Sequence, residues 1–315
     1  MVGKILITPK SYKNYKEDAH RLLKQQGYEI IENNLGRTMT ETEIIEAAKE
    51  DVVGIIVGVD PLPSQVLSEC KALRAISKYG VGMDNIDLKK AEELGIKVQN
   101  AVGTNAVSVA EHAIGLMFAC SRHLFELVRD VKDFSWNRKI GFELTEKKLG
   151  VIGGGQIGRE VAKRSVGIGM NVTIYDPYFK DGGFLEEYGI EKQDDLSLVL
   201  ETSDLVTLHL PANEETKGLI NKETLKLMKS TAVLINTSRG ELVVESDLYE
   251  ALVNEEIAFA AQDVYSSEPP KQGDPLIGLP NFLLTPHSGA YTHEAVKRMV
   301  MISTQNLVNL LNMKI

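Results

Sequence analysis

The sequence has few of the residues that build disulfide frameworks or structural metal sites. It contains two cysteines, Cys70 and Cys120, which are far apart and have no Cys-x-x-Cys spacing or histidine cluster near them. A disulfide scaffold or a structural zinc site is therefore not expected, and we predict no metal. This cysteine usage is typical of a reducing compartment, and we expect the protein to be cytoplasmic.

Positive charge and long apolar runs are also scarce. The 35 Lys and Arg residues against 44 Asp and Glu residues give a formal net charge of −9, with no basic run. Binding to nucleic acid or to an anionic membrane through counterion release is therefore not expected. The longest apolar stretch, residues 106–120, is interrupted by Glu111 and His112 and cannot span a bilayer. The apolar run at residues 4–8 is too short for the core of a signal peptide.

What remains is the composition of an ordinary globular protein. The 315 residues are 43% hydrophobic and 25% charged, a length that predicts about two domains. Short runs rich in Ile and Val predict strands at residues 4–8, 28–31, 52–59, 73–77, 96–100, 149–152, 172–175, 205–210, 232–236, 257–261 and 282–285. Because these runs lack polar–apolar alternation and are separated by helical stretches, they predict two parallel, doubly wound α/β sheets.

Four segments predict helices. Residues 40–49 and 64–72 lie between predicted strands, and Thr40 with Glu43 forms a capping-box pattern. Residues 104–131 have helical apolar spacing and predict one unusually long helix, which either bridges domains, forms an oligomer contact or is a plain core helix. Residues 292–313 predict a final amphipathic helix.

The segment at residues 149–176 carries a nucleotide-binding pattern. Gly153, Gly155 and Gly158 form G-x-G-x-x-G between a predicted strand and a predicted helix, and the next strand ends in Asp176. Such glycines allow a tight turn and let a pyrophosphate approach a helix N-terminus, while the carboxylate meets ribose hydroxyls. Asp176 would repel a 2′-phosphate, which favours NAD over NADP. A methyltransferase nucleotide fold is the alternative for this motif.

Three later residues could carry the chemistry. Arg239, Glu268 and His287 each follow a predicted strand, where ligands bind in doubly wound sheets. Reduction of a 2-oxoacid needs a cation for the carboxylate and carbonyl, and a proton donor for the forming alkoxide. Arg and His suit these tasks, and a neighbouring Glu would orient the His. Taken singly, each could be a surface charge, a turn residue or a helix cap. We interpret His112 as a hydrogen-bonded core histidine.

Six motifs in order then point to a known family. They are residues 77–87, 103–117, 150–164, 235–243, 263–270 and 285–295. The chain resembles the D-isomer-specific 2-hydroxyacid dehydrogenases over nearly its whole length. The resemblance implies catalytic roles for Arg239, Glu268 and His287, and a substrate-carboxylate loop at Tyr79, Gly80, Val81 and Gly82. It implies cofactor contacts at Gln156, Ile157, Leu210, Thr237, Ser238, Asp263, Ser288 and Gly289, beside the glycines and Asp176.

The resemblance also implies a domain arrangement. A Rossmann NAD-binding domain, residues 102–289, would be inserted into a flavodoxin-like substrate domain formed by residues 1–101 and 290–315. It further implies a homodimer built on the long helix after residue 104, and closure of a cleft on ligand binding.

Within the family, the motifs are most similar to phosphoglycerate dehydrogenases. Lys78 and Arg138 match basic positions near the substrate phosphate in that subfamily, whereas Gly58 falls where another basic residue is usual. The chain matches a short form without the serine-binding regulatory domain, so feedback by serine is not expected. Glyoxylate or hydroxypyruvate reduction and D-lactate formation remain alternatives, as does a non-catalytic NAD-sensing protein. Glu268 argues against the formate dehydrogenases, which by resemblance have a glutamine at this position.

Overall fold

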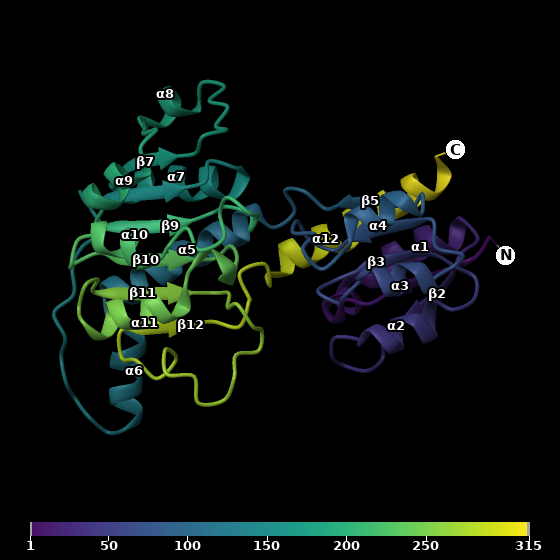
Figure 1. Ribbon diagram of the computed structural model, residues 1–315, viewed down its shortest axis with the longest axis horizontal. Helices are drawn as coiled ribbons and strands as arrows, with labels where there is room; N and C mark the ends of the chain where they lie inside the picture. Colours follow the sequence, from purple (N-terminus) through teal and green to yellow (C-terminus); the bar gives the residue numbers. More distant parts are fainter. Residues whose placement is uncertain (1, 314–315) are drawn as a thin grey trace. The chain divides into compact units, whose positions relative to one another are not determined.

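The computed structural model describes residues 2–313, which form two compact units (Figure 1). One unit contains the residues up to Asn105 together with those from Tyr291 onward, and the other is Ala106–Ala290. The second unit is therefore a continuous segment inserted into the first.

The discontinuous unit contains a five-stranded parallel sheet. Its strands are β1 (Lys4–Ile7), β2 (Glu29–Glu32), β3 (Val52–Val57), β4 (Ala75–Lys78) and β5 (Lys97–Asn100), in the order β2-β1-β3-β4-β5. Its helices are η1 (Lys10–Tyr15), α1 (Lys16–Gln25), α2 (Glu41–Ala48), α3 (Ser64–Glu69), α4 (Leu88–Glu93) and α12 (His293–Asn312). This strand order is that of the flavodoxin-like fold, which reverses direction between β1 and β3.

Helices cover this sheet on both faces. Apolar side chains of α2, α3 and α4, such as Ile44, Val66 and Ala91, form one core with Leu6, Ile55 and other strand residues. Helix α12 packs against β3, β4 and β5 and beside α1, so the last segment of the chain completes the sheet formed by the first segment.

The inserted unit contains a seven-stranded parallel sheet. Its strands are β6 (Lys148–Ile152), β7 (Asn171–Tyr175), β8 (Glu191–Lys192), β9 (Leu205–Leu208), β10 (Val233–Asn236), β11 (Phe259–Gln262) and β12 (Phe282–Leu284). The order β12-β11-β10-β9-β6-β7-β8 is the Rossmann order with one added strand. Its helices are α5 (Ala106–Ser121), α6 (Leu124–Lys132), α7 (Gln156–Ile168), α8 (Phe184–Tyr188), α9 (Leu196–Thr202), α10 (Lys222–Leu227), η2 (Gly240–Leu242) and α11 (Glu245–Val253).

Alternate residues of the buried strands enter two different cores. On β10, Leu234 packs with the core that includes α9, α10 and α11, whereas Val233 and Ile235 pack with the core that includes α5 and α7. Burial on both faces explains why these strands read as continuous apolar runs. The prediction of two doubly wound parallel sheets, with a Rossmann unit inserted in a flavodoxin-like one, is confirmed.

The predicted strands and short helices correspond to observed elements, and both hydrogen bonds of the Thr40–Glu43 capping box are present. The prediction of one long helix over 104–131 is wrong, because the segment forms α5 and α6. The break falls at His123, whose backbone is left-handed with φ 51°. The Ser121 carbonyl accepts the N–H of Phe142 at 2.9 Å, which takes that acceptor from the helical ladder. The two-residue strand β8 was not predicted.

Candidate active site

One edge of the seven-stranded sheet gathers the predicted cofactor and catalytic residues. All of them follow the carboxyl ends of parallel strands, whose arrows share one direction in Figure 1. After β6 come Gly153, Gly155, Gln156, Ile157 and Gly158; after β7 comes Asp176; after β9, Leu210; after β10, Thr237, Ser238 and Arg239; after β11, Asp263 and Glu268; after β12, His287, Ser288 and Gly289.

The glycine loop has a shape that suits a dinucleotide. Gly153 has φ 103°, and a Cβ there would lie 2.4 Å from the His209 carbonyl oxygen; a Cβ on Gly158 would lie 1.9 Å from the Gly153 oxygen. These two glycines close the turn and let α7 approach it. A Cβ on Gly155 would meet no atom within 4 Å, so the backbone at the N-terminus of α7 is open. An open backbone at a helix N-terminus fits a pyrophosphate.

The carboxylate of Asp176 is fixed beside that loop. Its Oδ2 accepts the N–H of Gly154 at 2.8 Å, and its Oδ1 accepts the N–H of Tyr178 at 2.8 Å. This placement fits a partner for ribose hydroxyls, which follow the pyrophosphate along a dinucleotide.

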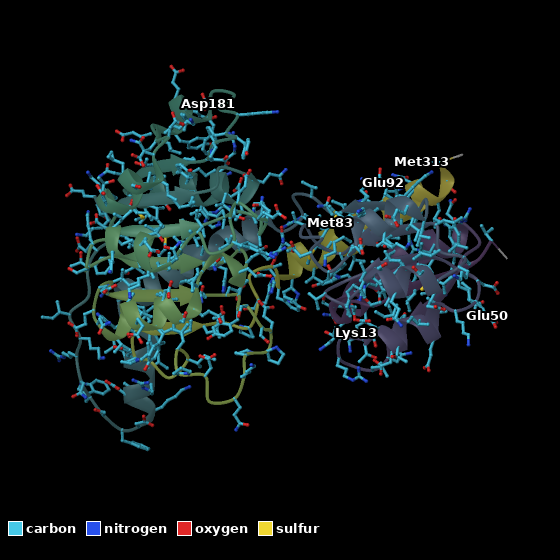
Figure 2. The ribbon with its side chains drawn as sticks, in the orientation of Figure 1. Lys13, Glu50, Met83, Glu92, Asp181 and Met313 are labelled. Atoms are coloured by element: carbon cyan, nitrogen blue, oxygen red, sulfur yellow. The ribbon has the colours of Figure 1, made fainter. Side chains whose placement is uncertain are left out.

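Arg159, in the first turns of α7, is committed to the loop after β7. Its guanidinium donates to the carbonyls of Gly154 and Asp181 at 3.2 Å each, and Asp181 is labelled in Figure 2. The same group stacks over the rings of Phe179 and Phe184, at 4.4 and 4.8 Å from their centres. A cation held in this way is poorly placed to bind a 2′-phosphate, which agrees with NAD.

Glu268 and His287 form a hydrogen-bonded pair. Glu268 Oε2 lies 2.8 Å from His287 Nδ1, and the two side chains are 39% and 42% exposed, so both are open to a substrate. Glu268 Oε1 also accepts the N–H of Tyr265 at 3.0 Å. Burial raises the pKa of Glu268, but the His287 hydrogen bond and charge, the Tyr265 N–H and the charge of Arg239 together hold the pKa below its usual value. The ionised carboxylate is thus available to orient the imidazole.

The backbone around His287 is held by Asp263, which is 2% exposed. His287 has φ 50°, and its N–H donates to the Asp263 carbonyl at 2.8 Å. The Asp263 carboxylate accepts the N–H groups of Ser288 and Gly289 at 2.9 and 2.7 Å. Burial raises the pKa of Asp263, and these hydrogen bonds, with those from His112 and Thr285, outweigh burial and lower it. A buried anion therefore fixes the turn that carries His287.

His112 on α5 belongs to this network. Its Nε2 lies 3.0 Å from Thr285 Oγ1 and 3.3 Å from Asp263 Oδ1. The interpretation of His112 as hydrogen-bonded is confirmed, but its placement in the core is wrong, because the side chain is 26% exposed. The sequence also did not reveal that its partners support the His287 turn.

Arg239 follows β10 in a turn that is hydrogen-bonded to the adjacent strand β9. Its Nη1 donates to the Ser238 carbonyl at 2.7 Å, and the Ser238 hydroxyl donates to the Leu208 carbonyl on β9 at 2.7 Å. Arg239 is also near enough to contribute to the lowered pKa of Glu268. The inserted unit thus brings a cation, a carboxylate and an imidazole to one edge of its sheet.

The candidate substrate loop, Tyr79–Gly82, belongs to the other unit. It follows β4, and Met83, the next residue, is labelled in Figure 2. Within residues 2–313, the N–H groups of Gly80, Val81 and Gly82 have no hydrogen-bond acceptor, as an anion-binding nest requires.

Of the two predicted phosphate-binding cations, Lys78 is used inside its own unit. It is 7% exposed, and its ammonium donates to the Gly58 carbonyl and, at 2.7 Å, to Asn85 Oδ1. Arg138 is exposed in the segment between α6 and β6 of the inserted unit.

Two negative observations apply to residues 2–313. There, no three or more His, Cys, Asp or Glu side chains are grouped so as to bind a metal ion. Over the same residues, every helix is too short or too polar to cross a membrane.

Comparison with known proteins agrees with this architecture. The chain is 38% identical over 310 residues to D-3-phosphoglycerate dehydrogenase of Methanocaldococcus jannaschii, covering 98% of this chain and 57% of that protein. The chain therefore spans little more than half the length of that relative. It is 37% identical to hydroxypyruvate reductase of Thermotoga maritima, covering 90% of this chain and 91% of that protein.

A solved structure is similar as well. The D-lactate dehydrogenase of Escherichia coli superposes with a TM-score of 0.84 at 30% identity, covering 98% of this chain and 96% of that one. Residues 114–289 match the NAD-binding domain of the D-isomer-specific 2-hydroxyacid dehydrogenases. This chain belongs to that family, and its inserted unit carries the family's NAD-binding domain.

Proposed function

We propose that this protein is an NAD-dependent oxidoreductase that interconverts a small 2-oxoacid and its D-2-hydroxy acid. The observation that carries the proposal is the Glu268–His287 pair at 2.8 Å, at the same sheet edge as Arg239 and the open Gly155 backbone. The family assignment supports the cofactor and the reaction class.

Each residue has a role in this mechanism. The Gly153–Gly158 loop and Asp176 would hold NADH, which would supply the hydride for C2 of the oxoacid. Arg239 binds the carboxylate and polarises the carbonyl, because its planar fork offers several N–H donors. His287 donates the proton to the forming alkoxide, and the hydrogen bond to ionised Glu268 keeps its ring oriented. In the discontinuous unit, the N–H groups of Gly80, Val81 and Gly82 would form an anion nest that suits a carboxylate.

Two substrate classes are candidates. Relatives at 38% and 39% identity are D-3-phosphoglycerate dehydrogenases, which favours 3-phosphoglycerate and 3-phosphohydroxypyruvate. The Lys78 ammonium instead donates to Gly58 and Asn85 within its own unit, which favours an unphosphorylated acid such as hydroxypyruvate or glyoxylate.

The test is NADH oxidation with 3-phosphohydroxypyruvate, hydroxypyruvate, glyoxylate and pyruvate side by side, repeated with NADPH. Turnover with at least one acid, and a preference for NADH, would support the proposal. The acid with the highest kcat/KM would select the substrate class. NADH binding without turnover of any 2-oxoacid would favour a non-catalytic NAD-sensing protein instead.

We also propose a homodimer. Helix α6 and the segment after it carry large apolar side chains that are strongly exposed: Leu124, Val128, Val131, Phe134, Trp136 and Ile140. Such a continuous apolar segment is typical of a surface that another chain covers. Sedimentation equilibrium should give twice the chain mass, and Phe134→Asp with Ile140→Asp should shift it toward the monomer. A monomeric wild-type protein at micromolar concentration would refute this point.

A further inference from the structure

Two buried amides lie directly behind the Arg239 turn. Asn236 and Gln262 are the last residues of β10 and β11, they are partners in the parallel register, and both are 0% exposed. Because both side chains are fully buried, neither can contact a substrate directly.

The amide of Asn236 spans the turn that leads to Arg239. Its Oδ1 accepts the N–H of Ser238 at 3.0 Å, and its Nδ2 donates to the Arg239 carbonyl at 2.8 Å. The second Nδ2 hydrogen is donated to Gln262 Oε1 at 3.1 Å. The orientation of the amide follows from these partners, because a reversed amide would face the Ser238 N–H with a donor and the Arg239 carbonyl with an acceptor.

The Oε1 atom of Gln262 accepts the remaining N–H of the Asn236 amide, but burial of Gln262 lowers the stability of the fold. Within residues 2–313, Gln262 Nε2 is buried and has no hydrogen-bond partner. An apolar side chain of similar volume would avoid that unpaired donor, so burial of Gln262 is poorly explained by stability.

We infer that Asn236 is a positioning residue for Arg239, and that Gln262 keeps the Asn236 amide in the required orientation. This inference rests on the proposed role of Arg239. The Asn236–Gln262 pair fixes the Ser238 N–H and the Arg239 carbonyl, one on each side of the Ser238–Arg239 peptide. The direction in which the Arg239 side chain extends from the backbone is thereby fixed. A displacement of about 1 Å in a substrate-binding group can lower the rate by roughly 10²-fold.

Three single variants test the inference. Asn236→Ala removes the bridge and should lower kcat/KM for the 2-oxoacid by roughly 10²-fold, a larger change than any in NADH affinity through Ser238. Gln262→Met removes the acceptor and the unpaired donor together, so kcat/KM should fall by a smaller factor while Tm stays equal or rises. Asn281→Ala is the matched control, since the Asn281 amide donates to the Leu252 and Ala258 carbonyls at 3.1 and 3.4 Å, just before β12. It should lower Tm without lowering kcat/KM.

A double-mutant comparison separates positioning from general damage. In an Arg239→Ala background, Asn236→Ala should cost less than about twofold further, because the group it positions is gone. An equal loss in both backgrounds would overturn the inference, as would a Gln262→Met variant whose Tm and kcat/KM fall together.

A crystal structure of Asn236→Ala reads the position of Arg239 without any turnover. A displaced Ser238–Arg239 turn supports the inference, and an unmoved turn overturns it. Failure of the proposed function is distinct, because it would be seen as a wild-type protein that turns over no 2-oxoacid.

Discussion

The two sheets of this protein use the charged residues at their carboxyl edges in opposite ways. In the seven-stranded sheet, the side chains of Glu268 and His287 are about two-fifths exposed, and buried Asp263 accepts hydrogen bonds from the turn that carries His287. In the five-stranded sheet, Lys78 and Asp60 are themselves buried, at 7% and 2% exposed. Asp60 accepts the hydroxyl of Thr8 and the N–H of Met39.

This difference separates chemistry from scaffolding. Polar side chains in half-open positions can meet a substrate, whereas buried polar side chains that satisfy backbone and side-chain partners fix loops. We propose that the five-stranded unit binds its ligand through the backbone N–H groups of Gly80–Gly82 rather than through charged side chains. The following predictions test that division.

The largest effect should come from His287→Ala. Loss of the proton donor should lower kcat by roughly 10²–10⁴-fold, while NADH binding measured by fluorescence stays nearly intact. His293, which lies with its partner Tyr15 in the discontinuous unit, provides the control, and His293→Ala should leave kcat unchanged. Unchanged turnover in His287→Ala would remove this residue from the mechanism.

The next effect should come from Gly155→Ala. The new Cβ meets no protein atom, so Tm should stay the same, but it would fill the space that the pyrophosphate needs. NADH should bind about tenfold more weakly or worse, which is ~1.4 kcal/mol or more. Gly167→Ala, also without neighbours within 4 Å and on the same helix, should raise stability by up to about 1 kcal/mol and leave NADH affinity alone. Equal NADH affinity in the two variants would contradict the cradle.

Lys78→Met should act on stability rather than on chemistry. The Gly58 carbonyl and Asn85 lose a buried donor, so the free energy of unfolding in urea should fall by roughly 1–3 kcal/mol. The ratio of kcat/KM for phosphorylated and unphosphorylated acids should not change. A selective loss of the phosphorylated substrate would instead make Lys78 a phosphate ligand and erase the contrast between the sheets.

The smallest effect concerns His209, which follows β9. Unlike His287, this histidine is buried. Burial lowers the pKa of His209 to about 3, and within residues 2–313 its Nδ1 has no hydrogen-bond partner. As pH falls below about 6.5, the unfolded chain binds a proton that the folded chain refuses, so stability falls progressively toward pH 3. His209→Gln should remove this part of the slope, which amounts to about 0.4 kcal/mol at pH 6.5 and grows at lower pH. An unchanged pH slope of the urea midpoint would show that His209 titrates normally.

Much of the architecture could be predicted from local patterns. Strands buried on both faces leave continuous apolar runs, and Gly153, Gly155 and Gly158 leave a pattern because their positions exclude a Cβ or leave room for a ligand. The break at His123 could not be predicted, because it depends on a hydrogen bond from Phe142 far along the chain.

The supporting layer of the site was missed for a similar reason. The supporting residues are Asn236, Gln262 and His112. They act through partners on other strands and helices, so the spacing of apolar residues along the sequence does not reveal their role. A usable signal existed at Asn236 and Gln262, since each is a polar residue that ends an otherwise apolar strand.

The most direct test of the central claim is to follow the hydride. Wild-type protein should be incubated with NADH that carries deuterium at both C4 positions and with the preferred 2-oxoacid, and the product examined by mass spectrometry and chiral chromatography. The account predicts a D-2-hydroxy acid carrying deuterium at C2, formed far more slowly by His287→Ala. An unlabelled product, or the L isomer, would contradict it.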